Sequence, residues 1–119
     1  MERWYLATLL SLILHQIDAA FWHEWDMFRV PGGVQGFLVF NLVAVGGLLH
    51  GYRQVALAKR SARTYAIICG ITGMATAGIH VLFAAAGREE FHLPLSIAAL
   101  AACLFAGAGL VLTTLRHRR

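Results

Sequence analysis

Four long apolar stretches dominate this chain of 119 residues and limit the folds that it can adopt. They cover residues 4–21, 35–52, 64–86 and 94–115, and each approaches the roughly 20 residues that an α-helix needs to cross a bilayer. Hydrophobic residues make up 59% of the chain, and charged residues only 13%. So small a globule cannot bury that much apolar surface, so lipid must cover part of it.

The links between these stretches are short, which places consecutive helices side by side and antiparallel. We therefore expect an all-α fold, an integral membrane four-helix up-down bundle, with residues 1–119 forming a single transmembrane domain. We interpret the first stretch as a span and not as a signal peptide, because His15 and Asp18 interrupt its apolar core.

The charge distribution predicts the orientation of the bundle. Eight of the ten lysines and arginines fall on one predicted side: Arg3, Arg53, Lys59, Arg60, Arg63, Arg116, Arg118 and Arg119. Because cytoplasmic loops carry an excess of such residues, we expect a multi-pass protein of the cytoplasmic (inner) membrane with both termini in the cytoplasm. The basic residues then contact membrane lipids, and no nucleic-acid partner is expected despite the net charge of +4.

A polar motif interrupts the first span. His15 and Asp18 are one helical turn apart and share a face, and His23 and Glu24 follow at the end of the span. An ionised residue in the middle of a span costs at least about 2.5–3.5 kcal/mol, so such residues are treated as functional by default. Counted from the outer boundary, we expect Asp18, Asn41 and His80 about 10 Å deep, and His15 about one turn deeper.

This pattern predicts a metal centre in the outer half of the bundle. We expect His15, Asp18, His80 and His23 as ligands of a divalent transition metal such as zinc or iron. Glu24 is the candidate catalytic base, acting in hydrolysis or oxidation of a lipid-soluble substrate at that metal, and a role as fourth ligand or as partner of a ligand is its alternative. Haem ranks below a non-haem metal, because Asp18 fits poorly against an apolar porphyrin face.

Three alternatives to a metal centre remain open at the level of the sequence. The polar groups can form a hydrogen-bonded lock between helices, or relay protons or ions in a transporter. The chain can also be a non-catalytic accessory subunit of a larger membrane complex, or form a homo-oligomer. Cys69 and Cys103 lie in separate spans and form no C-x-x-C motif, so thiol-redox and zinc-ribbon functions have no support.

The residues His15-x-x-Asp18-Ala19, followed by His23-Glu24-Trp25, carry a family resemblance. They resemble the H-E-L-D-A…H-E-W signature of an uncharacterised family of small bacterial four-span membrane proteins, and distantly the H-x-x-E-E membrane proteins. Gln16 and Ile17 replace the Glu and Leu of that signature, which removes one carboxylate. The resemblance implies a four-helix membrane fold and implies no activity.

Overall fold

Four long helices and one short helix form the protein. The computed structural model describes residues 1–117, and Arg118 and Arg119 of the predicted basic tail lie outside the described residues. The helices are α1 (Glu2–Phe21), α2 (Glu24–Met27), α3 (Val34–Ala56), α4 (Ala62–Ala85) and α5 (Pro94–Arg116). The four long helices are long and apolar enough to cross a membrane. The predicted fold class is confirmed, and the chain is a multi-pass membrane protein.

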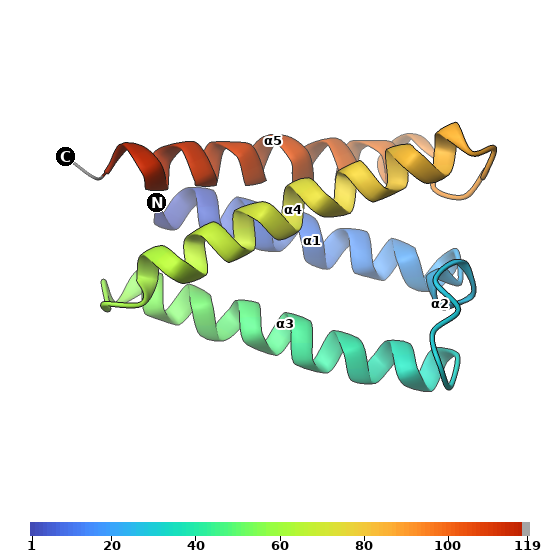
Figure 1. The fold of residues 1–119 in the computed structure, drawn as a ribbon, viewed down its shortest axis with the longest axis horizontal. Coiled ribbons are helices and arrows are strands. Elements are labelled where there is room, and N and C mark those ends of the chain that lie inside the picture. The colour runs from blue at the N-terminus through green and yellow to red at the C-terminus, as the bar shows by residue number, and fades with distance from the viewer. Residues whose placement is uncertain (118–119) are drawn as a thin grey trace.

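The helices alternate in direction, as expected for an up-down bundle. The start of α1, the end of α5 and the α3–α4 link lie at one end (Figure 1). The opposite end holds α2 and the α4–α5 loop (Figure 1). Glycines make the turn before α3, where Gly32 and Gly33 adopt positive φ angles of 81° and 58°. Pro94 occupies the first turn of α5, where its missing N–H has no helical partner to lose.

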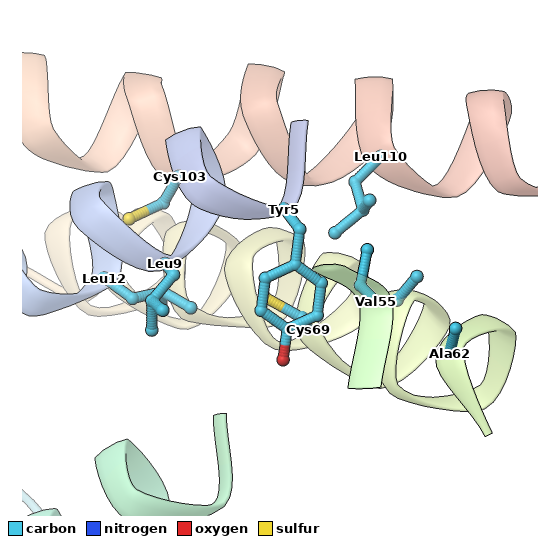
Figure 2. Close-up of a cluster of buried hydrophobic side chains, with 9 residues drawn as sticks. Tyr5, Leu9, Leu12, Val55, Ala62, Cys69, Cys103 and Leu110 are labelled. Atoms are coloured by element: carbon cyan, nitrogen blue, oxygen red, sulfur yellow. The ribbon is translucent and has the colours of Figure 1, made fainter. Parts of the chain in front are cut away.

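A cluster of buried side chains joins α1, α3, α4 and α5 (Figure 2). Its members are Tyr5, Leu9, Leu12, Val55, Ala62, Ala66, Cys69, Cys103 and Leu110. Tyr5 is fully buried, and its hydroxyl donates a 2.8 Å hydrogen bond to the carbonyl oxygen of Leu48. This bond fastens α3 to α1. Both cysteines are free and fully buried, so they act as small apolar side chains.

Helices α4 and α5 approach most closely where two glycines face each other. A Cβ atom on Gly107 would lie 2.6 Å from the carbonyl oxygen of Gly70, and one on Gly70 would lie 2.8 Å from that of Gly107. Small residues of this kind let membrane helices pack through their backbones.

Helix α3 packs least against the others. Only 11% of its apolar window is buried, compared with 28–39% for the other three long helices. Most of its middle turns therefore face outward, and the bundle consists of a tight group of α1, α4 and α5 with α3 at its side (Figure 1).

We predict that Gly107→Ala destabilises the bundle by about 1–3 kcal/mol, because the new methyl group meets a rigid backbone carbonyl. The matched control is Gly78→Ala on α4, where an added Cβ meets no atom within 4 Å. Unfolding in micelles by denaturing detergent, followed by circular dichroism, measures both variants. Equal stability of the two variants would contradict the close α4–α5 contact.

Candidate metal centre

Two imidazoles meet in the half of the bundle that carries α2 and the α4–α5 loop. His15 comes from α1 and His80 from α4, and their side chains are 1% and 4% exposed. The ring centroids lie 4.7 Å apart with an interplanar angle of 67°. The predicted convergence of His15 and His80 is therefore present in the structure.

Glu24 reaches the two imidazoles because the chain reverses after α1. That helix ends at Phe21, and His23 takes a left-handed conformation with φ 53° and ψ 51°. Left-handed backbone is uncommon outside glycine, although histidine adopts it more readily than most residues. The reversal starts the short helix α2 at Glu24 and turns its side chain, which is 12% exposed, back into the bundle.

The three side chains surround one point. The Nε2 atom of His15 lies 3.7 Å from one carboxylate oxygen of Glu24, and the Nε2 atom of His80 lies 3.6 Å from the other oxygen. One ligand atom of each residue lies within 4.8 Å of the others. Ligand atoms bound at about 2.0–2.2 Å to a tetrahedral ion lie about 3.3–3.6 Å apart. The two imidazole–carboxylate distances are close to this range, and the three ligand atoms together lie within 4.8 Å of one another.

Polar atoms in this region lack hydrogen-bond partners among the described residues. Six buried side-chain nitrogen or oxygen atoms of residues 1–117 have none, and five of these belong to residues 15–24. They are His15 Nδ1, His15 Nε2, Gln16 Oε1, Asp18 Oδ2 and Glu24 Oε2. Buried polar groups without partners are costly, so their concentration points to a ligand or ion.

Other polar side chains of the spans bond to their own helix instead. Thr8, Ser11, Thr72 and Thr114 each donate to the carbonyl oxygen four residues earlier, at 2.7–2.8 Å. Such local bonds satisfy hydroxyl groups in an apolar medium. The hydroxyl groups of Ser11 and Thr72 are therefore satisfied within their own helices, whereas His15 and His80 lie against each other.

Aromatic side chains shield the centre from the outer surface. Phe91, in the α4–α5 loop, is 4% exposed and lies 4.3 Å from the ring of His80 and 5.2 Å from that of His15. Its φ of 64° is left-handed and strained for this residue type. The shielding keeps the local dielectric constant low, which strengthens any interaction of the Glu24 carboxylate with a cation.

A cavity of about 350 Å³ adjoins the centre. His15, Glu24 and His80 form its polar end, and Gln16 and Thr76 add polar groups to its wall. The remaining wall is apolar: Trp25, Phe28, Val30, Phe37, Phe40 and Ile79.

The other predicted site residues lie apart from this group. Asp18 accepts a 3.2 Å hydrogen bond from the indole of Trp22. The side chain of His23 is 63% exposed, stacks on Trp25 and lies 4.0 Å from Asp26. Asn41, expected at the same depth, donates to the carbonyl oxygen of Phe37 in its own helix. Metal ligation by Asp18 and His23 stays a prediction, and neither side chain belongs to the His15–Glu24–His80 group.

Sequence reasoning did not find Phe91 and gave Glu24 the role of a base. No sequence signal marks Phe91, because a loop phenylalanine between charged residues reads as a turn or interface residue. The sequence does mark Glu24, because it is an acidic residue directly after the first span. The direction of its side chain depends on the left-handed backbone of His23.

We predict that Phe91→Ala lowers the free energy of unfolding by about 3–5 kcal/mol, because a buried aromatic ring is lost. Phe105→Ala on α5 is the control, since that ring is 71% exposed and faces the outside of the bundle. Unfolding in micelles compares the two variants. A similar loss in both would mean that Phe91 does not cover the centre.

Comparison with known proteins identifies a family whose function is unknown. A family of unknown function, DUF6713, matches residues 1–117. No curated protein matches the chain, and no solved structure matches it. The expectation of an uncharacterised family is confirmed in this general form. With the match covering nearly its whole length, the chain belongs to the family of unknown function DUF6713.

Proposed function

We propose that this protein is a membrane-embedded metal protein whose centre consists of His15, His80 and Glu24. The observation that carries the proposal is the meeting of two buried imidazoles and one carboxylate at ligand-like spacing. Each ligand comes from a different helix, so the centre depends on the folded bundle.

The distances favour a metal centre over a hydrogen-bonded lock. A lock needs donor–acceptor distances of about 2.7–3.2 Å, because hydrogen bonds weaken steeply beyond that range. The two imidazole–carboxylate distances are 3.7 and 3.6 Å, and both nitrogens of His15 lack partners among the described residues. An ion between the three residues would satisfy His15 Nε2 and an oxygen of Glu24, which a lock at these distances leaves unpaired.

Zinc and iron are the metals that this ligand set favours. Two histidines and one carboxylate bind catalytic zinc with a fourth position open, and the same set binds non-haem iron in oxygenases. The metal would supply an activated water or an open position for oxygen. Haem fits poorly, because the Glu24 carboxylate occupies the space between the two Nε2 atoms.

Glu24 combines two roles in this proposal. One carboxylate oxygen binds the metal, and the other holds or accepts a proton beside it. The sequence-based role of Glu24 as a base is thereby kept for the oxygen that is not bound.

The orientation proposed from charge puts the centre toward the cell exterior. The start of α1 and the end of α5 lie at one end of the bundle, and α2, which begins with Glu24, lies at the other (Figure 1). With the basic residues in the cytoplasm, the protein spans the inner membrane and its metal centre lies in the outer half.

The main test measures bound metal in protein purified from metal-replete cells. We expect His15→Ala, His80→Ala and Glu24→Gln each to lose a stoichiometric metal, because two remaining ligands hold a divalent ion weakly. His50→Ala is the control, since His50 is exposed and bonds to Gln54 on α3. Elemental analysis gives the stoichiometry, and circular dichroism checks that each variant is folded. A folded, metal-free parent protein would refute the proposal.

A second test separates the three proposed ligands from the other predicted ones. We expect Asp18→Asn and His23→Ala to retain bound metal, because neither residue belongs to the three-residue group. The same elemental analysis applies. Loss of the metal in Asp18→Asn with an intact fold would return Asp18 to the ligand set and displace Glu24 to the role of a base alone.

The competing function is that of a non-catalytic subunit in a larger membrane complex. The weakly packed α3 favours it, because an apolar helix face is available to a partner or to lipid. A protein that purifies only together with a partner, and without metal, would support this function instead.

A further inference from the structure

The structure assigns a ligand class to the cavity beside the centre. We propose that it binds a bilayer-soluble molecule with an oxygen-containing head and an apolar tail, admitted from the membrane between α3 and α4. This inference rests on the proposed metal centre for the position of the head. The position of the tail rests on the cavity alone.

The cavity is polar at one end and apolar elsewhere, which fixes the orientation of its ligand. The three candidate metal ligands form the polar end. Gln16 lines the cavity beside them, and its buried side-chain oxygen has no hydrogen-bond partner among the described residues. A head that offers one oxygen to the metal and one N–H or O–H to Gln16 would satisfy both. Trp25, Phe28 and Phe37 then surround an apolar tail.

Exposed lining residues mark two openings of the cavity: one beside Phe28, which follows α2 and is 43% exposed, and one between α3 and α4 at membrane depth, which we call the mouth. Phe40 on α3 and Ile79 on α4 line the cavity, yet they are 55% and 41% exposed, so they stand where the cavity meets the outside. Phe40 lies six residues after the start of α3, and Ile79 six residues before the end of α4. At a rise of 1.5 Å per residue, both lie about 9 Å from the outer ends of their helices. The surroundings at that depth are hydrocarbon, so the ligand enters from the lipid.

Helix α3 contacts the other helices near its two ends and not along its middle, which explains why the mouth lies between α3 and α4. At the outer end, buried Phe37 packs against Trp25 at 5.3 Å. Toward the inner end, the carbonyl oxygen of Leu48 accepts the hydrogen bond from Tyr5, and Gly51 lies against Tyr65. Between these points α3 carries no buried residue. At Gly46 and Gly47 an added Cβ would meet no atom within 4 Å. The unfastened stretch includes Phe40, so the mouth opens where α3 packs least.

A volume of about 350 Å³ limits the ligand to a small head and a slender tail. It falls at the lower end of the range of ligand cavities, about 300–1,000 Å³. A single medium-length alkyl chain fits such a volume, and a two-chain phospholipid does not. The ligand class is therefore a single-chain or small-ring amphiphile with a metal-binding oxygen.

The test uses ω-bromooctanohydroxamic acid, whose head binds metals and whose bromine quenches nearby tryptophan. The protein is reconstituted in lipid nanodiscs with Co²⁺, so that absorption of cobalt reports the head and fluorescence reports the tail near Trp25. Acetohydroxamic acid is the water-soluble probe without a tail, and Trp25→Phe identifies the quenched residue. We expect saturable quenching by the long probe and a cobalt spectral change at about tenfold lower concentration than with the short probe.

Two variants and one control test the cavity. Thr76→Phe fills the cavity wall and Ile79→Phe narrows the mouth, whereas Thr72→Phe adds the same ring one turn away, outside the cavity lining. We expect the first two to raise the half-saturating concentration of the long probe by about tenfold and the control to change it by less than about twofold. Bound cobalt should be unchanged in all three.

The possible failures of the two proposals are distinct. Unchanged affinity in Thr76→Phe and Ile79→Phe with cobalt bound, or quenching that rises without saturation, would overturn the cavity ligand and leave the metal centre intact. Absence of bound cobalt together with saturable, Thr76→Phe-sensitive quenching would overturn the metal centre and support the tail site.

Discussion

The reversal of the backbone at His23 organises the outer end of this protein. Without the left-handed residue, α1 would run outward and the Glu24 carboxylate would lie in solvent. With it, α2 folds back and the carboxylate lies between two imidazoles, at 3.7 and 3.6 Å. The burial of three ionisable groups, the aromatic cover of Phe91 and the cavity beside them all depend on this one turn. Backbone strain of this kind persists only where the surrounding structure holds it, and it gathers at functional sites.

Two kinds of packing divide the bundle into a tight part and a loose part. The backbones of α4 and α5 touch at Gly70 and Gly107, and Tyr5 adds a polar fastening near the termini. The hydrophobic effect does not drive helices together in lipid, so this close packing and these few polar contacts stabilise the bundle. Helix α3 takes little part in it, and its middle turns stay exposed on the side of the bundle. The bundle thus combines tight packing among α1, α4 and α5 with loose packing of α3, and the cavity lies beside the loosely packed helix.

The sequence predicted the helices, their antiparallel order and the meeting of His15 with His80, because hydropathy fixes span depth and depth brings residues to one level. It did not predict which way each helix is rotated. Asp18 and Asn41, predicted at the level of His80, do not belong to its group: Asp18 accepts a hydrogen bond from Trp22, and Asn41 bonds to its own helix. The rotation of a helix about its own axis depends on how its side chains pack against the other spans. It therefore cannot be predicted from the sequence of one span alone. The position of Glu24 depends on the φ angle of His23, and the position of Phe91 depends on a strained loop. Neither feature produces a periodic pattern in the sequence.

The origin of the three central side chains has a consequence for the order of assembly. His15 and Glu24 belong to the first hairpin, whereas His80 belongs to the third span. During synthesis the first hairpin therefore enters the membrane with only two of the three candidate metal ligands. Only when α4 has inserted and packed beside α1 does the third ligand arrive. A nascent chain cannot hold a metal ion tightly before that point, so ion capture would be a late event that reports correct assembly of three spans.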